Sequence, residues 1–319
     1  LARVKATVVK SIKKDGWAIL NAEDEYCMKL VKDLSCNIAY FSMDENSAVA
    51  KQLAKDGKIV AVYEKGFITI KKGEWKIRVE RATHVPLTLG GKAKFMIANV
   101  LAATLAAYLQ GFKTEDISLS LQTFIPSAAQ TPGRMNIFEF KKFKVLIDFA
   151  HNPSGYRGVE DYLNSVEATK KIGIIAGVGD RRDEDIRECA LIAARMFDHI
   201  IIRQEKHLRG RTEEEINALI LQGIAESGKN VTHEVIPKEV EALKSLMQQQ
   251  HQVQQQQQTQ IAQVQAQPVQ LAAAPVTKSE TSFTGLKSKA GASVNIYGYV
   301  RGDANYIIEG ADDDFNKVA

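Results

Sequence analysis

Cysteine is scarce in this sequence, and neither sign of charge is in large excess. The 319 residues include three cysteines, Cys27, Cys36 and Cys189, without CxxC spacing. Neither a disulfide framework nor a zinc site is therefore indicated. The formal net charge of +4 is too small to indicate a nucleic-acid partner. Because 45% hydrophobic and 25% charged residues are average values, the composition excludes wholesale disorder and favours a soluble α/β enzyme.

The sequence also lacks an initiator methionine and a signal peptide. It begins Leu1-Ala2-Arg3, without a basic region followed by an apolar one. We therefore expect an internal fragment of a longer protein. The unpaired cysteines favour a reduced compartment, so we expect the cytoplasm.

Residues 1–130 have the pattern of a mixed α/β domain. Apolar runs and β-branched residues predict strands, and longer Ala- and Leu-rich stretches predict helices. The helix at 95–110 is apolar on most sides, which predicts a buried helix. The expected elements are short apolar strand candidates at 4–12, 17–20 and 37–42, a helix at 47–55, an antiparallel meander at 58–81 and the helix at 95–110.

Residues 131–247 alternate more regularly between strands and helices. This βαβ rhythm predicts a mostly parallel, Rossmann-like sheet with helices on both faces. Ligands bind such sheets at the carboxyl ends of the strands, so chemistry is expected in the loops that follow them. The expected strands are 144–149, 171–176, 199–203 and 231–236, and the expected helices are 156–165, 186–196, 213–225 and one beginning at 239.

The composition changes sharply near residue 247. Residues 248–290 are rich in Gln, with Ala, Pro, Thr and Ser, and predict a disordered linker or a coiled coil that needs partner chains. From Val294, small or apolar residues alternate with polar or aromatic ones. This dyad pattern is typical of an outer-membrane barrel strand, so residues 291–319 predict one isolated strand of that kind.

Polar residues at two loops form the strongest candidate site. Arg134 follows a Thr-Pro-Gly turn, and Asp148 ends a strand before His151 and Asn152. An Asp at a strand end can accept hydrogen bonds from ribose hydroxyls, and a nearby Arg can neutralise a phosphate. Taken singly, each residue is equally consistent with a turn-forming or capping role.

Together these loops resemble the Mur ligase family, in which a Gly-Arg pair opens the C-terminal domain and a DYAHNP-like loop contacts ATP. Here the loop reads Asp148-Phe149-Ala150-His151-Asn152-Pro153, with Phe in place of the usual Tyr. The resemblance implies a partial central domain at 1–130 and a C-terminal domain at 131–247. It also implies that Arg134, Asp148, His151 and Asn152 bind ATP and that Asn99 lies at the base site, although Asn99 is also consistent with helix packing.

Two further loops resemble the cyanophycin synthetases within that family. One is residues 179–185, Gly-Asp-Arg-Arg-Asp-Glu-Asp, and the other is residues 206–211, Lys-His-Leu-Arg-Gly-Arg. The resemblance implies that arginine is added to the side-chain carboxylates of polyaspartate, a cyanophycin primer. The residues implied in substrate binding are Asp180, Arg181, Arg182, Asp183, Arg209 and Arg211, although a solvated, charged helix start would look similar.

The implied reaction is an ATP-dependent amide (C–N) ligation through an acyl phosphate, with Mg²⁺ as a cofactor. No GxxxxGK[ST] stretch occurs, and Gly90-Gly91-Lys92 lacks the upstream Gly of a phosphate-binding loop. We therefore expect the chain to be inactive on its own and name no catalytic base or metal ligand. A homo-oligomer is expected, and a peptidoglycan-precursor or folylpolyglutamate ligase is the alternative with the same fold.

The tail from about residue 240 resembles the start of a DcaP-like trimeric outer-membrane porin. In such porins a coiled coil precedes the first barrel strand. In this chain a Gln-rich stretch precedes the segment of alternating residues. A cytoplasmic ligase and a secreted porin do not share a compartment. We therefore infer a chimera, with a seam between about 238 and 247, and retain a porin fragment as the alternative of a different class.

Overall fold

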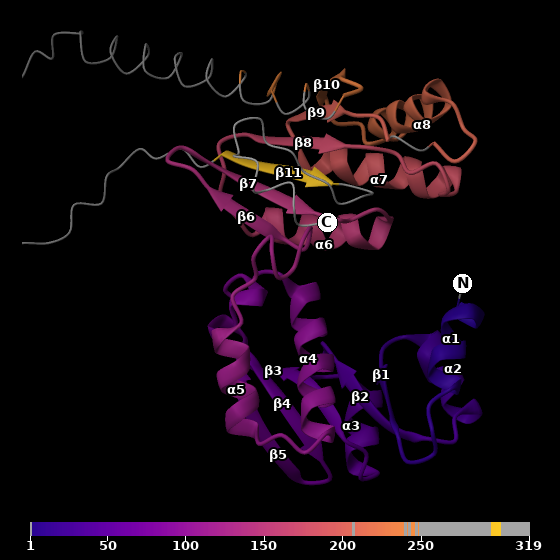
Figure 1. The fold of residues 1–319 in the computed structure, drawn as a ribbon, viewed down its shortest axis with the longest axis vertical. Helices are drawn as coiled ribbons and strands as arrows, with labels where there is room; N and C mark the ends of the chain where they lie inside the picture. Colours follow the sequence, from indigo (N-terminus) through magenta and orange to yellow (C-terminus); the bar gives the residue numbers. More distant parts are fainter. Residues whose placement is uncertain are drawn as a thin grey trace, which may run out of the picture. The chain divides into compact units, whose positions relative to one another are not determined.

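The computed structural model describes residues 2–205 and 208–238, the isolated positions 241, 244–245 and 248, and the strand at 295–300. The chain divides into two compact units (Figure 1). Unit 1 comprises Leu1–Thr131 and Arg157–Val166, and unit 2 comprises Pro132–Tyr156 and Glu167–Ala319. Within the described residues, no helix has both the length and the apolar character needed to span a bilayer.

Unit 1 contains a five-stranded sheet in the order β1-β2-β3-β4-β5. β1, β2 and β3 are parallel, whereas β4 and β5 continue the sheet in antiparallel fashion. The meander expected at 58–81 is thus confirmed, and β3 also pairs with β2. The strands are β1 (Trp17–Asn21), β2 (Asn37–Ser42), β3 (Val60–Glu64), β4 (Phe67–Lys72) and β5 (Trp75–Arg81).

Helices and short 3-10 turns connect these strands. The expected helix at 47–55 is confirmed, because Ser47 Oγ caps it by accepting a hydrogen bond from the Ala50 N–H. The α-helices are α1 (Ala2–Lys10), α2 (Glu25–Leu30), α3 (Ala48–Lys55), α4 (Lys94–Leu109) and α5 (Thr114–Thr123). The 3-10 turns are η1 (Val31–Asp33), η2 (Ala82–His84) and η3 (Pro86–Thr88).

Two expectations for unit 1 are wrong. Residues 4–12 do not form a strand, because most of them belong to α1. Ala6 is buried and Val9 packs against a core cluster, while Val4 and Val8 are exposed, which is helical spacing. α4 is buried along one face rather than all round, and Asn99 lies on its exposed side.

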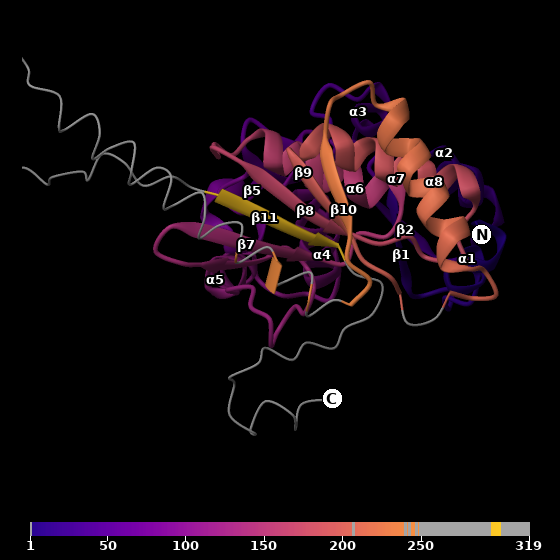
Figure 2. The same cartoon turned by 90° about the horizontal axis from the view of Figure 1, so that it is seen from above.

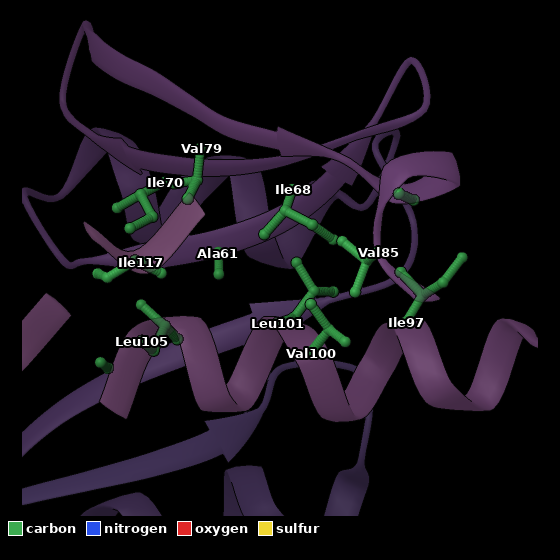
Figure 3. Close-up of a cluster of buried hydrophobic side chains, with 12 residues drawn as sticks. Ala61, Ile68, Ile70, Val79, Val85, Ile97, Val100, Leu101, Leu105 and Ile117 are labelled. Carbon is green, nitrogen blue, oxygen red and sulfur yellow. The ribbon is translucent and has the colours of Figure 1, made fainter. Parts of the chain in front are cut away.

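The main core of unit 1 lies between its sheet and α4 (Figure 3). Ile68 and Ile70 from β4 and Val79 from β5 face Leu101 and Leu105 from α4, and all five are at least 93% buried. A second cluster on the opposite face contains Ala18, Tyr40 and Val60, against which residues of α1, α2 and α3 pack. The sheet is therefore covered on both faces.

Unit 2 contains a six-stranded sheet in the order β10-β9-β8-β11-β7-β6 (Figure 1). Figure 2 shows β11 between β8 and β7. All neighbouring pairs are parallel except β6 and β7, which form an antiparallel edge. The expected mostly parallel sheet is confirmed. Its strands are β6 (Asn136–Glu139), β7 (Phe143–Asp148), β8 (Lys171–Ile175), β9 (His199–Ile202), β10 (Thr232–Val235) and β11 (Asn295–Val300).

The expectation of an isolated strand near the C-terminus is wrong. The backbone of β11 pairs with β7 from Asn295↔Phe143 to Val300↔Asp148, and with β8 over residues 296–299. β7 and β8 thus satisfy their backbone hydrogen-bonding groups through a strand that lies between them. The rest of the Gln-rich and porin-like segments, residues 249–294 and 301–319, lies outside the described residues.

Three helices follow the strands of unit 2. They are α6 (Pro153–Asn164), α7 (Asp183–Met196) and α8 (Glu213–Glu226). α7 and α8 pack closely, since a Cβ on Gly223 would come within 3.0 Å of the Arg187 backbone. Ile172, Ile174 and Ile201 form a small core cluster in the sheet. Each helix begins after the carboxyl end of a strand, which brings the preceding loops to one edge of the sheet.

Candidate functional site

Asp148 connects the two loops that the sequence indicates. It ends β7, and its side chain is 6% exposed. Oδ2 accepts a hydrogen bond from the Met135 N–H at 2.9 Å, and Oδ1 accepts one from the Ala150 N–H at 2.8 Å. The Phe149 N–H donates to the Gly133 carbonyl at 2.6 Å, which holds the same loops together. The buried Asp148 side chain therefore holds the loop at 133–135 against the loop that follows β7.

The turn before β6 has an unusual backbone. Gly133 has φ of +65° and Met135 has φ of +50°, a region that favours glycine. The Gly133 N–H donates to Asn136 Oδ1 at 2.7 Å, and the Met135 N–H donates to Asp148. These bonds offset the strain at Met135 and leave the intervening Arg134 exposed.

Burial raises the pKa of the Asp148 carboxyl, because removal from water disfavours the charged form. The Met135 and Ala150 N–H groups, and the nearby charges of Arg134 and His151, oppose this increase in the pKa. Asp148 accepts its hydrogen bonds from two backbone N–H groups. Its carboxylate is therefore suited to fixing the two turns.

Arg134, Phe149 and His151 form a contiguous group. The Arg134 guanidinium carbon lies 5.1 Å from the Phe149 ring centroid, and the Phe149 and His151 centroids are 5.2 Å apart in an edge-to-face arrangement. His151 Nδ1 lies 3.0 Å from the Phe149 carbonyl. Because a carbonyl can only accept, Nδ1 carries the proton there, so neutral His151 has Nε2 as an acceptor. A cation and an imidazole thus contact the same aromatic ring.

Asn152 begins helix α6. Its Oδ1 accepts a hydrogen bond from the Gly155 N–H at 2.9 Å, which is the geometry of a helix cap. Its carbonyl also accepts from the Tyr156 N–H at 3.0 Å. The capping role that the sequence left open is therefore what Asn152 performs here. The start of α6 adds the partial positive charge of a helix N-terminus next to His151.

A pocket opens at the same strand ends of unit 2. It is bounded by the end of β8, the first turn of α6 and one side of α7. Sequence reasoning identified His151 and Arg181 but missed the wall formed by α6 and α7, because helical periodicity does not show which face meets a pocket. The lining residues are His151, Tyr156, Ile175, Ala176, Gly177, Val178, Arg181, Asp185, Ile186, Cys189, Ala190 and Ile220.

Tyr156 and Cys189 give this wall a buried polar component. Tyr156 is 2% exposed, and burial raises the pKa of its phenol well above the usual value. The Cys189 thiol raises that pKa further, whereas the charge of Arg203 lowers it. These three groups come from α6, α7 and the end of β9, so their proximity depends on the tertiary fold.

The charged loop at 179–185 lies against residues 208–211 of the basic loop. Arg211 bridges them, because its guanidinium contacts Asp183 Oδ1 at 2.7 Å and donates to the Arg181 carbonyl at 3.0 Å. A Cβ on Gly179 would overlap the Leu208 carbonyl, so only glycine permits this approach. The structure thus brings Asp183, Arg181 and Arg211 together, as expected for loops at one edge of a parallel sheet.

The other charged residues of these loops differ in whether they form ion pairs. Arg182 donates to both carboxylate oxygens of Asp185, at 3.0 and 2.8 Å, and this hydrogen bonding lowers the pKa of Asp185. Asp180 is exposed, with one carboxylate oxygen 3.9 Å from Arg181 Nε. Arg209 is exposed and has φ of +55°, and it has no ion pair within the described part of the chain. Arg209 is therefore available to an external anion.

Asn99 lies in unit 1. Its side-chain nitrogen is 3.7 Å from Met96 Sδ on the same helix, which is a weak contact, and Asn99 is exposed. The Asn21-Ala22-Glu23-Asp24 turn, also in unit 1, is held by hydrogen bonds of its side chains. Asp24 Oδ1 caps α2 by accepting from the Cys27 N–H at 2.8 Å, and Glu23 accepts from Ser42 Oγ at 2.8 Å.

Comparison with known proteins identifies relatives for both units. Residues 133–256 match the family model described as Mur ligase, glutamate ligase domain. A cyanophycin synthetase from Trichormus variabilis is 42% identical over 243 residues, which cover 76% of this chain and 27% of that protein. A UDP-N-acetylmuramoyl-L-alanyl-D-glutamate–2,6-diaminopimelate ligase from Caldanaerobacter subterraneus is 25% identical over 244 residues, which cover 76% of this chain and 46% of that protein.

A solved structure shares the fold. The folylpolyglutamate synthase of Mycobacterium tuberculosis, complexed with ADP and AMPPCP, matches with a TM-score of 0.57 and 11% identity, over 93% of this chain and 55% of that one. The present chain spans about a quarter of the length of the cyanophycin synthetases it matches. It is homologous to those enzymes and carries a C-terminal domain of the Mur ligase type.

Proposed function

We propose that this chain is part of an ATP-dependent amide ligase that joins arginine to the side-chain carboxylates of polyaspartate. The observation that carries the proposal is the 42% identity to a cyanophycin synthetase over 243 residues. The corresponding identity to the diaminopimelate-adding ligase is 25%, which favours the arginine-adding reaction over peptidoglycan-precursor synthesis. We place this ligase part in the cytoplasm and expect it to form homo-oligomers.

In this proposal, the group at the end of β7 holds ATP. Arg134 neutralises phosphate charge with a planar guanidinium, and His151 Nε2 accepts a hydrogen bond from a hydroxyl of the ligand. The start of α6, capped by Asn152, adds N–H groups that favour an anion. Asp148 acts indirectly, because its two backbone hydrogen bonds set the positions of Arg134 and His151. A contact of Asn99, in unit 1, with the adenine base of a nucleotide is a separate prediction.

The adjoining loops receive the other substrates. Arg209 is the cation available to a carboxylate of polyaspartate, whereas Arg211 keeps the two loops together through Asp183. Asp180 is an exposed carboxylate and fits the guanidinium of an incoming arginine through charge-assisted hydrogen bonds. Arg182 is already paired with Asp185 and stabilises the start of α7.

ATP supplies the phosphoryl group that activates the carboxylate in ligases of this type. The described residues contain no group of three or more His, Cys, Asp or Glu side chains arranged to hold a metal ion. Mg²⁺ in nucleotide sites is held mostly by phosphate oxygens and water, with one or two protein carboxylates, and we assign no step to a metal. Because the sequence also has no GxxxxGK[ST] stretch, we propose that this chain binds ATP without turning it over.

The proposal is tested by nucleotide binding to the full chain, measured as thermal stabilisation and by calorimetry. Arg134→Ala is expected to weaken ATP binding about tenfold, as loss of a charge-assisted contact would. Lys141→Ala is the matched control, because Lys141 is an exposed cation in the turn before β7. Equal affinity of the Arg134→Ala variant and the wild type would refute this assignment.

A second measurement addresses turnover. The purified chain, given polyaspartate, arginine and ATP, is expected to release no phosphate above background. Hydrolysis that depends on both substrates would show that the chain is active by itself. Thermal stabilisation by diaminopimelate or glutamate, but not by arginine, would favour one of the other ligases.

The origin of the tail is a separate proposal. We infer that the residues after a seam between about 238 and 247 come from a different parent, because their Gln-rich composition departs from that of the ligase part. A continuous genomic read across residues 230–260 tests this inference. An intact join in independent isolates would contradict a chimera produced by misassembly.

A further inference from the structure

A β-bulge in unit 1 gathers arginine side chains around one aromatic ring. β5 is the edge strand of its sheet, and its register against β4 shifts between Ile68 and Thr69. Arg81 lies opposite Phe67 and Arg78 lies opposite Thr69, so positions that are three apart on β5 face positions that are two apart on β4. The bulge therefore places Arg78 and Arg81 on the same face as Phe67.

The buried side of β5 agrees with this register. Val79 and Glu80 are consecutive, yet they are 7% and 8% exposed. Val79 points with Ile70 toward α4 (Figure 3). Glu80 accepts hydrogen bonds from Ser118 of α5, at 2.6 Å, and from Gln122. Because two successive residues of β5 are buried, the residues on either side of them share the opposite face.

Arg78 and Arg81 are in contact with the ring and free of acidic partners. Their guanidinium carbons lie 5.0 and 4.5 Å from the Phe67 ring centroid. Neither forms an ion pair within the described part of the chain. The ring stabilises each cation and restricts the long side chain, so less conformational entropy is lost on binding a ligand.

The carboxylate on this face is already engaged. Glu64 of β3 lies 2.6 Å from Lys71 Nζ and 3.6 Å from Lys76 Nζ. The hydrogen bond from Lys71 lowers the pKa of Glu64, although burial opposes that decrease in the pKa. On this face of β3, β4 and β5, four basic side chains thus meet one carboxylate. The positive excess lies at Arg78 and Arg81.

We propose that Phe67, Lys76, Arg78 and Arg81 form a docking surface for an extended acidic peptide. Guanidinium groups bind carboxylates bidentately, and Lys76 and Arg78 are separated by about 7 Å along the strand, the spacing of alternate side chains in an extended peptide. A nucleic acid fits less well, because the guanidinium groups already occupy the ring on which a base would stack. This surface belongs to unit 1 alone.

The choice of polyaspartate as the natural occupant rests on the proposed function, whereas the affinity for acidic peptides does not. The surface would hold a part of the polymer that is not reacting. Such a contact adds affinity by keeping the chain at high effective concentration. The charge, the aromatic ring and the bulge are the features on which the surface depends.

The test measures binding of a short fluorescent polyaspartate peptide to the full chain without ATP, by anisotropy at low ionic strength. Arg78→Ala combined with Arg81→Ala is expected to weaken binding about tenfold, since each exposed charge contact contributes modestly. Lys92→Ala combined with Lys113→Ala removes the same charge from exposed positions elsewhere in unit 1 and should change the affinity less than about twofold.

Substitution of both arginines by lysine keeps the charge but removes the planar fork, and is expected to give an intermediate loss. Equal weakening by the arginine and control pairs would overturn the proposal, as would tighter binding of a single-stranded oligonucleotide of equal charge. Absence of polyaspartate binding would overturn it too, while leaving the ATP-binding test of the proposed function intact. Circular dichroism of each variant verifies folding.

Discussion

Buried carboxylates in the two units respond to burial in opposite ways. Glu80 in unit 1 is 8% exposed and Asp148 in unit 2 is 6% exposed. Burial would raise the pKa of Glu80, but hydrogen bonds from Ser118, Gln122, the Arg81 N–H and His84 lower that pKa to about 2. The pKa of Asp148 is raised by burial despite its two backbone donors.

The hydrogen-bond donors, not the degree of burial, decide the direction of the pKa shift of these two carboxyls. Glu80 receives hydrogen bonds on both oxygens from α5, η2 and its own strand. Asp148 receives one hydrogen bond on each oxygen. Each additional donor favours the ionised form and opposes the cost of desolvation. Glu80 therefore anchors α5 as an anion, while the pKa of Asp148 is raised above its ordinary value.

Removal of the Glu80 side chain is expected to have the largest effect. Glu80→Ala leaves Ser118 and the Arg81 N–H without their acceptor, and should lower the free energy of unfolding by about 3 to 4 kcal/mol. Urea unfolding followed by tryptophan fluorescence measures it, because Trp17 and Trp75, the two tryptophans of the chain, lie in unit 1. Glu74→Ala, in an exposed turn, is the control. A loss below about 1 kcal/mol would show that the hydrogen bonds to Glu80 contribute little.

Acid should act on the same contacts. The pKa of Glu80 is about 2 in the folded chain, below its ordinary value of 4.5. Its contribution is therefore complete above pH 4.5 and is lost as the pH falls toward 2, which amounts to about 3 kcal/mol. Stability measured by tryptophan fluorescence across this range should depend less steeply on pH in Glu80→Gln. Identical pH profiles would contradict the assignment.

Asp148→Asn is expected to have a smaller effect of about 2 kcal/mol, because the amide can accept from the Met135 or the Ala150 N–H but not from both. Hydrogen exchange at these two amides measures the loss in unit 2.

The contribution of Asp148 to stability depends on pH with the opposite sign to that of Glu80. Since the pKa of Asp148 is raised on folding, its stabilising contribution decreases as the pH rises through the folded pKa. Unchanged exchange at both amides would refute the positioning role.

Arg134→Ala is expected to have the smallest effect on stability, within about 0.5 kcal/mol, because the side chain is exposed. Its charge lowers the pKa of Asp148, so its removal should raise that pKa further. Carbon-13 NMR of the Asp148 carboxyl during titration measures the change. A decrease in the pKa would contradict the attraction between these groups.

Local patterns accounted for much of the fold. Strand β2 occupies residues 37–42 as expected, and α3 and the alternation of β7 to β10 also follow the predictions. The patterns failed for α1, where a short apolar run of alternating composition is equally consistent with a strand. They also did not reveal α2, α5 or β6. α2 and β6 span only six and four residues, which is too short to show a period.

The site was predictable as a set of loops but not as a set of contacts. The expectation that polar residues collect at strand ends identified Arg134, Asp148 and His151. No spacing indicated that Asp148 accepts from an N–H 13 residues earlier, or that Arg211 reaches the Arg181 carbonyl 30 residues away. Such contacts depend on how strands pair, which local sequence does not encode.

The sequence by itself determined the alternation of elements, the edge of the sheet at which charged loops collect and the resemblance to amide ligases, because periodicity and motifs are local properties. The position of β11 between β7 and β8 and the different donors of Asp148 and Glu80 depend on the tertiary structure, as does the bulge that places Arg78 and Arg81 on one face. The physical reason is that register, burial and hydrogen-bond partners arise between residues distant in the chain.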